Sequence, residues 1–357
     1  MKITTVDTHT EGQATRIIVS GLEPLGGATM DERRREFRFR YDRLRTALVG
    51  EPRGHAGMLT CALIDPCSPD ADFGVLFMHN AGYLDVAGHA VMGVATALFE
   101  TGIIDAEGDS GAVVFETPAG LVHATVCLDG GRVRSVTVRG VPAWIGLLGA
   151  SLEVPGHGEI IVDAGYGGSH FVWAWAEHLG VELEPGNMPA VLAAGRAVLD
   201  AANERLAVRH PETGERVALQ VATILDAPHH ELPALRNVHV WGPSQFDRSP
   251  GASGASARLA VMHARGEILT GDEVVVESPI THGLFRARVV EETRVGARGA
   301  VITEVTGTAH VTGLHDFVFD AADRLNEGFL VGDPPADQGV EEEQEEPEEP
   351  EEGASAE

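Results

Sequence analysis

Two glycine-rich turns in this chain carry residue types that suit the binding of a small anion. The first is Ala87-Gly88-His89, and the second runs from Gly251 to Gly254. Each precedes a stretch predicted to be helical, and the start of a helix exposes unpaired backbone N–H groups and the positive end of the helix dipole. Glycine also lets an anion approach that backbone closely. If the turns face each other, they bind a small carboxylate from both sides; the alternative is two tight strand-to-helix turns without a ligand.

Polar residues flank both turns and strengthen the prediction of a ligand. Those beside the turns are Asp85, His89, Asp247, Arg248, Ser249 and Ser253. Two more polar clusters interrupt strand-like sequence, at 7–12 (Asp-Thr-His-Thr-Glu-Gly) and at 51–55 (Glu-Pro-Arg-Gly-His).

The segments that follow the turns predict two buried helices. Residues 90–102 and 253–267 are small or apolar on nearly every side, and glycines stand at their ends, Gly102 and Gly266. A helix that is apolar all round must be buried on all sides. Because the turns lie about half the folded length apart, we expect an α/β (α+β) fold of two similar halves, each a curved sheet around one central helix.

The other elements are short strands and two further helices. Runs of β-branched residues bounded by Gly, Pro, Asp or Asn recur along the chain and predict strands. Thr29 and Glu32 have capping-box spacing and predict a helix start. In the sequence that follows, Phe37, Tyr41, Leu44 and Leu48 recur every three or four residues, which predicts an amphipathic surface helix. Another helix is expected near Pro189–Ala202.

Composition excludes several classes of protein. The 357 residues include 26 Lys+Arg and 54 Asp+Glu, a formal net charge of −28, so we expect no nucleic-acid partner. No apolar run is long enough for a membrane span. Three cysteines are too few for a disulfide framework, which favours a cytoplasmic protein with reduced thiols. Lys2 is the single lysine, so a Schiff-base mechanism has essentially no candidate nucleophile.

Acidic residues are concentrated at the C-terminal end. Residues 333–357 contain no basic residue and almost no aliphatic one, and Glu dominates them. Such a segment cannot bury enough surface to offset its ordering entropy, so we expect a disordered, solvating tail. A docking tail for a basic partner is the alternative.

Four segments together resemble the proline racemase superfamily, which comprises proline racemases, 4-hydroxyproline 2-epimerases and trans-3-hydroxyproline dehydratases. They are Thr-His-Thr-Glu-Gly at 8–12, Glu-Pro-Arg-Gly-His at 51–55, and the longer segments 80–102 and 246–267. The resemblance runs from residue 1 to about 330. It implies a diaminopimelate-epimerase-like fold, with the site between two domains: residues 1–160 together with the last strands to about 330, and residues 161–310.

The resemblance also implies a chemistry whose usual side chains are missing here. The superfamily exchanges a proton at the α-carbon of an imino acid without a cofactor, using two cysteines on opposite faces. The matching positions in this chain hold Ala87 and Gly251, which cannot be catalytic. Cys61, Cys67 and Cys127 fall outside both motifs, and we expect them to serve structural packing.

The residues that would bind the substrate are kept. The resemblance assigns Gly88, His89, Ala252 and Ser253 to the carboxylate and Asp247 to the region of the substrate nitrogen. His89 could instead be a satisfied polar residue at a helix start, and Asp247 a turn or capping residue.

Two other histidines are candidates for the missing bases. His170 follows a glycine pair, and His282 stands in an altered stretch that the resemblance puts near the pocket. Imidazole can act as acid or base near neutral pH; the alternative is that each merely fills space. The His229-His230-Glu231 run lacks a recognisable metal-ligand spacing, so we expect no metal and no cofactor.

These observations lead to two functional hypotheses. The first is an enzyme that abstracts the α-proton of proline, hydroxyproline or a related imino or amino acid, as a racemase or epimerase or as a dehydratase. The second is a catalytically silent binding or regulatory protein that keeps the pocket. In both, the partner is a small molecule, and a homodimer is possible.

Overall fold

The computed structural model describes residues 1–228, 234–242 and 245–331. The acidic tail predicted at 333–357 and the His229–Glu231 run lie outside the described residues. Within the described part of the chain, every helix is too short or too polar to span a membrane. The helices are α1 (Met30–Val49), α2 (Gly88–Glu100), α3 (Ala176–Leu179), the 3-10 turn Pro185–Asn187, α4 (Met188–Arg205) and α5 (Ala252–Ala264).

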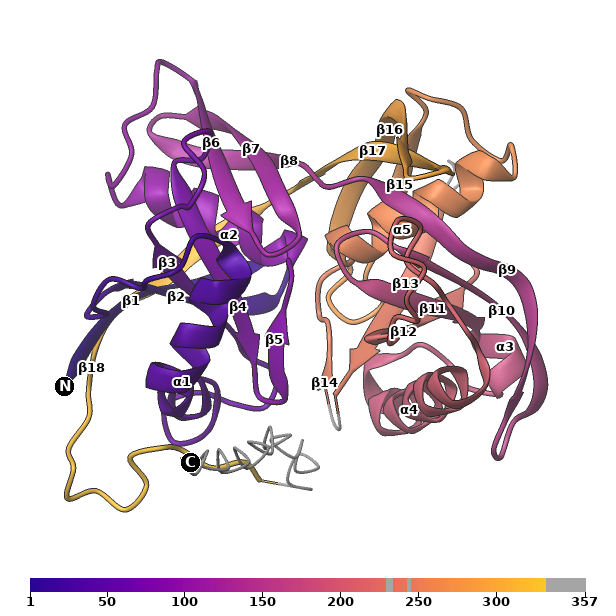
Figure 1. Cartoon of the computed structure of the whole chain (residues 1–357), viewed down its shortest axis with the longest axis horizontal. Coiled ribbons are helices and arrows are strands. Elements are labelled where there is room, and N and C mark those ends of the chain that lie inside the picture. The colour runs from indigo at the N-terminus through magenta and orange to yellow at the C-terminus, as the bar shows by residue number, and fades with distance from the viewer. Residues whose placement is uncertain (229–233, 243–244, 332–357) are drawn as a thin grey trace, which may run out of the picture.

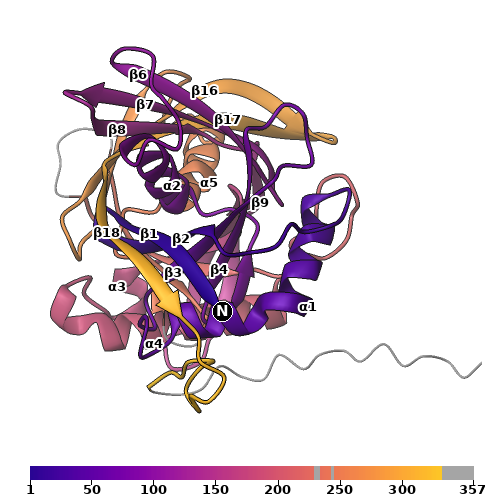
Figure 2. The same cartoon turned by 90° about the vertical axis from the view of Figure 1, so that its left-hand side faces the viewer.

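The first half of the molecule is a curved sheet around α2. Its strands are β1 (Lys2–Thr10), β2 (Gln13–Ser20), β3 (Leu59–Ile64), β4 (Phe73–His79), β5 (Gly82–Leu84), β6 (Ser110–Thr117), β7 (Gly120–Asp129), β8 (Arg132–Arg139) and β18 (Ala309–Val318). Pairing runs in the order β18-β1-β2-β3-β4-β6-β7-β8. Figure 2 looks onto this half and shows the strands surrounding α2.

The second half repeats this plan around α5. Its strands are β9 (Ala143–Val154), β10 (Gly158–Tyr166), β11 (His170–Trp175), β12 (Val221–Asp226), β13 (Ala234–Trp241), β14 (Gln245–Phe246), β15 (Glu273–Glu277), β16 (Leu284–Val295) and β17 (Arg298–Gly307). Pairing runs β9-β10-β11-β12-β13-β15-β16-β17 and returns from β17 to β9, so the strands form a closed ring.

Strands β17 and β18 connect the two halves. Strand β17 pairs with β16 along nearly its whole length, with β9 near its start and with β8 at its end, and β18 continues along β1. Figure 1 shows the two halves side by side, with β8–β9 and β17 passing between them. Strand β8 pairs within the first half and β9 within the second, so the halves change between them, earlier than the boundary at 160 suggested by the sequence. Strand β18 belongs with the first half.

Both central helices are buried as their composition predicts. Every residue of α2 from Gly88 to Phe99 is buried, and α5 is buried except at Ser253 and its last turn. Both helices end before a glycine in the left-handed region, Gly102 at φ +71° and Gly266 at φ +71°. The predicted architecture of a sheet around a central helix in each half is therefore confirmed.

The outer helices also follow their sequence patterns. The Thr29 hydroxyl accepts a hydrogen bond from the Glu32 N–H at the start of α1, as the capping box predicts. The apolar stripe of α1, which includes Phe37 and Leu48, is buried against β3 and β4. Helix α4 covers the predicted segment 189–202 and packs on β12, β13 and β9.

Candidate functional site

Helices α2 and α5 begin beside each other at the junction of the two halves. The Gly88 N–H donates to the Ser253 Oγ at 3.3 Å. A Cβ on Gly88 would lie 2.7 Å from the Ala252 methyl, so only glycine allows this approach. Neither helix has a side-chain cap at its start. Backbone N–H groups of both first turns are therefore gathered at one point, as an anion site requires.

A small cavity lies at this point. The first half lines it with Leu59, Leu84, Val86, Ala87, Gly88 and His89. The second half lines it with Ser169, Phe171, Val221, His239, Trp241, Asp247 and Gly251–Gly254. Its walls are thus mostly apolar, with a few polar groups on one side, as in many small-molecule sites.

A buried contact between a carboxylate and an imidazole joins the halves at this cavity. The Asp247 Oδ2 lies 3.2 Å from the His89 Nδ1, and both side chains are more than nine-tenths buried. Burial by itself would raise the pKa of Asp247, but the imidazoles of His89 and His239 and a hydrogen bond from Ser249 hold that pKa below its ordinary value. Asp247 is therefore a carboxylate at neutral pH. The other ring nitrogen of His89, Nε2, is buried and has no hydrogen-bond partner among the described residues.

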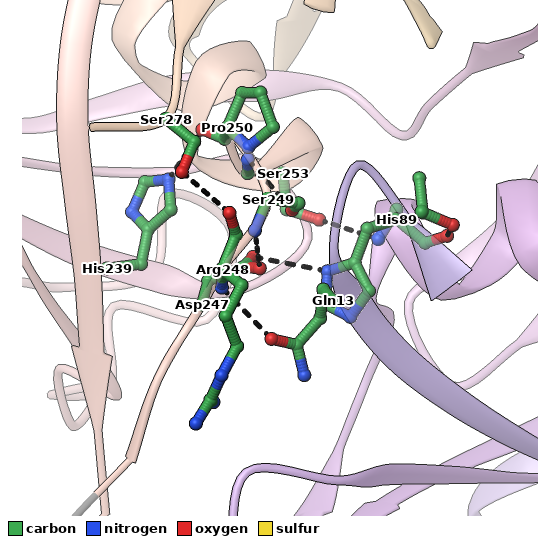
Figure 3. A network of polar contacts seen from close by, with 12 residues as sticks. Gln13, His89, His239, Asp247, Arg248, Ser249, Pro250, Ser253 and Ser278 are labelled. Carbon is green, nitrogen blue, oxygen red and sulfur yellow. Dashed lines mark hydrogen bonds and ion pairs between the residues drawn. The ribbon is translucent and has the colours of Figure 1, made fainter. Parts of the chain in front are cut away.

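Contacts across the junction hold the Asp247 segment in place (Figure 3). The Arg248 N–H donates to the Gln13 Oε1 at 3.0 Å, and the Gln13 side chain donates to the Gly57 carbonyl at 2.8 Å. From the other side, the Ser278 hydroxyl donates to the Arg248 carbonyl at 2.6 Å. Asp247 is consequently positioned by both halves.

His239 is a cavity residue that the sequence analysis missed. A Cβ on Gly251 would lie 1.9 Å from the His239 Nε2, and a Cβ on Gly254 would lie 2.1 Å from its Cε1. The imidazole therefore fills the space in which a side chain at position 251 would begin. Strand alternation puts Asn237, His239 and Trp241 on one face of β13. That alternation, together with glycine at 251, was the available signal.

The structure brings together most of the residues chosen from the sequence. Ala87, Gly88, His89, Asp247 and the start of α5, residues 251–253, all line the cavity. The two candidate bases do not. The His170 ring packs against Tyr166 and Trp144, and burial lowers its pKa to about 4. His282 has a 70% exposed side chain, 3.5 Å from Glu277.

The remaining polar residues of the motifs stabilise the fold. Asp7 forms a buried ion pair with Arg16 at 2.8 Å, and Arg16 also donates to the carbonyls of Leu48 and Arg53. Asp85 pairs with Arg34 on α1 at 2.6 Å. The ion pairs of Asp7 and Asp85 thus connect strands, loops and α1, and neither residue lines the cavity.

The cysteines do not replace the missing thiols. None of the three lines the cavity. Cys61 is buried, and burial raises its pKa. The expectation that all three serve packing was wrong for Cys127, which lies on the exposed side of β7. Within the described ranges, no three His, Cys, Asp or Glu side chains are grouped so that they could hold a metal ion.

Comparison with known sequences gives one family over nearly the whole chain. The family model described as proline racemase matches residues 5–330. The chain is 38% identical to the proline racemase of Clostridioides difficile over 329 residues, 92% of this chain and 98% of that protein. It is 40% identical to the 4-hydroxyproline 2-epimerase of Streptosporangium roseum over 91% and 97% of the two chains. Identity to the trans-3-hydroxy-L-proline dehydratase of Burkholderia ambifaria is 37%, over 92% and 98%.

Solved structures agree with this relationship. A hydroxyproline epimerase from Agrobacterium vitis with bound trans-4-OH-L-proline has a TM-score of 0.87 at 30% identity, over 93% of this chain and 96% of that one. The fold extends to methylitaconate-delta-isomerase, with a TM-score of 0.52 at 13% identity over 89% and 95% of the two chains.

We predict that Gly251→Ala destabilises the protein by roughly 2–4 kcal/mol. Gly251 has φ +83°, and the added methyl would overlap the His239 ring. Gly131→Ala is the matched control, because Gly131 has φ +77° and no atom within 4 Å of the added methyl, so it reports backbone strain alone. The free energy of unfolding in urea measures both variants. Equal losses would contradict the overlap with His239.

Proposed function

The chain belongs to the proline racemase family, and we propose that it is an enzyme that removes the α-proton of proline, a hydroxyproline or a closely related imino acid without the usual pair of thiols. The observation that carries the proposal is the cavity in which two uncapped helix starts and a buried carboxylate meet. The helix starts suit the carboxylate of an imino acid, and the buried carboxylate suits its ring nitrogen.

The carboxylate of the substrate would bind at the helix starts. The Gly88 N–H is bonded to the Ser253 hydroxyl, so the His89 amide of α2 and the Ala252 and Ser253 amides of α5 would provide the donors, and the two helix dipoles favour an anion. During removal of the α-proton, the electron pair of the Cα–H bond spreads into the carboxylate. Donors that are already oriented stabilise that added charge without reorganising, which lowers the barrier.

The ring nitrogen of the substrate would bind at Asp247. A buried carboxylate attracts a protonated amine strongly, because little water screens the charges. The His89 Nδ1, 3.2 Å from the Asp247 Oδ2, keeps the carboxylate oriented. The apolar residues Leu59, Val221 and Trp241 would face the carbon atoms of the ring.

A silent binding protein is the second candidate. Ala87 and Gly251 carry no ionisable group, which favours this alternative. Both candidates require the same ligand, so binding and proton removal must be measured separately.

For binding, we expect pyrrole-2-carboxylate to bind because it combines a carboxylate, a ring N–H and a planar α-carbon. Asp247→Asn should weaken binding about 10- to 100-fold by removing a buried charge-assisted hydrogen bond. Calorimetric titration provides the affinities. Asp316→Asn is the control, since Asp316 is an exposed partner of Lys2 and does not line the cavity. Pyrrole without a carboxylate should not bind. An absent response to pyrrole-2-carboxylate and to every proline derivative would refute the retained pocket.

For catalysis, we expect at least one proline derivative to lose its α-proton in D₂O. The set comprises L- and D-proline, both C2 epimers of 4-hydroxyproline, and trans-3-hydroxy-L-proline. Proton NMR follows exchange, and it also detects elimination in the 3-hydroxy compound. Because any working base must exchange or eliminate that proton, the test needs no assumption about the product. Binding of pyrrole-2-carboxylate without turnover of any substrate would favour the silent protein.

A further inference from the structure

The geometry points to His239 as the base of this enzyme, acting on one face of the substrate only. This inference rests on the proposed function, since it requires an imino acid in the cavity. It assigns a catalytic role to a residue outside both glycine-rich turns, and it predicts a stereochemical outcome. The enzyme would exchange or eliminate the α-proton of one enantiomer and would not interconvert enantiomers.

The position of the imidazole is the first argument. His239 lies on β13, lines the cavity, and has its Nε2 in the space where a side chain of residue 251 would begin. Two glycines, Gly251 and Gly254, make room for the ring against the first turn of α5. A base there is next to the amides that would hold the substrate carboxylate, and the α-carbon is directly bonded to that carboxylate. Figure 3 shows Asp247 between His89 and His239.

The hydrogen bonds of His239 suit a base. Its Nδ1 lies 2.7 Å from the Thr223 Oγ1, on the neighbouring strand β12. When Nδ1–H donates to that hydroxyl, Nε2 keeps a lone pair, and the Asn237 side-chain amide lies 3.4 Å from it. After Nε2 has taken a proton, the Pro250 carbonyl oxygen at 3.3 Å can accept a hydrogen bond from it. The Asp247 carboxylate stabilises the resulting imidazolium.

The reaction on this face is balanced without a further reagent. The Cα–H bond breaks, its proton moves to Nε2, and its electron pair enters the carboxylate system. In D₂O the imidazolium exchanges its proton and returns a deuteron to the same face, which preserves the configuration. In a substrate with a β-hydroxyl, the electron pair can instead expel hydroxide. The hydroxide takes the proton from the His239 Nε2 and leaves as water, which restores the neutral imidazole, and an unsaturated imino acid remains.

The first half of the molecule has no base at the position of Ala87. The first half contributes Leu59, Leu84, Val86, Ala87, Gly88 and His89 to the cavity. Of these, only His89 can ionise; its Nδ1 lies 3.2 Å from the Asp247 carboxylate, which fixes the ring at the start of α2, and its buried Nε2 has no hydrogen-bond partner among the described residues. Inversion needs a proton delivered from the face opposite the one from which it was removed. The Ala87 methyl offers none, so inversion should be very slow.

The pH dependence follows from the surroundings of the ring. Burial lowers the pKa of His239 below the ordinary value of 6.5; Asp247, from the segment before α5, opposes this shift, and His89, from α2, adds to it. The neutral imidazole is the base, so exchange should be constant around neutral pH and decline as acid protonates the ring. The decline in kcat/KM should have its midpoint below pH 6.5.

The test combines two substitutions with a rescue experiment. In His239→Gln and His239→Ala, exchange of the reactive enantiomer should fall at least about 100-fold, while pyrrole-2-carboxylate should bind within a few-fold of the unchanged protein. Free imidazole added to His239→Ala should restore part of the exchange. His178→Ala is the control, because His178 is an exposed histidine on α3. Thermal unfolding verifies that each variant is folded.

Several outcomes would overturn the inference. They are exchange that persists in both His239 variants, exchange that is lost in His170→Ala instead, and interconversion of L- and D-proline by the unchanged protein. A protein that binds the mimic but exchanges no substrate also contradicts a base at His239, whereas failure to bind the mimic contradicts the proposed function itself.

A variant with a new thiol at residue 87 tests whether His239 and residue 87 face opposite sides of the substrate. Ala87→Cys adds a thiol opposite His239, so interconversion of proline enantiomers should appear. The added His239→Ala substitution should abolish it. Interconversion that persists in the double variant would show that the second base is not His239.

Discussion

The close approach of two buried helix starts is the constraint on which the rest of the molecule depends. Gly88 contacts the Ala252 methyl directly, and its N–H is bonded to Ser253. Each helix is surrounded by its own sheet, so this contact fixes how the two halves meet. Strands β17 and β18 follow each other directly and carry the chain from the sheet of the second half into that of the first.

The same approach leaves little space in the cavity. The residues that fill this space therefore depend on one another. His239 occupies its place because Gly251 and Gly254 have no Cβ, and Gly251 adopts a φ of +83° that other residues rarely tolerate. Glycine at 251 and an imidazole at 239 therefore depend on each other, because a Cβ at 251 would overlap the ring. On the Ala87 side no comparable replacement fills the wall.

Burial decides the electrostatics of the cavity. Asp247, His89 and His239 lie within a poorly solvated region, where an isolated charge is costly. Asp247 remains charged because His89 and Ser249 bond to it. The two histidines share this single carboxylate, and the burial that lowers the pKa of His239 keeps that ring neutral and able to accept a proton.

Local sequence determined the elements and the binding turns, while the tertiary structure decided which imidazole reaches the cavity. The cap at Thr29, the glycine stops and the apolar surface of α2 and α5 depend on neighbouring residues, so they can be identified from the chain. His170 and His282 stood near motifs but point elsewhere. Strand β13 is buried on both faces, so alternation groups Asn237, His239 and Trp241 on one face without indicating that this face meets the cavity. Only the pairing of β13 with its neighbours and the packing of α5 against it bring His239 to Gly251.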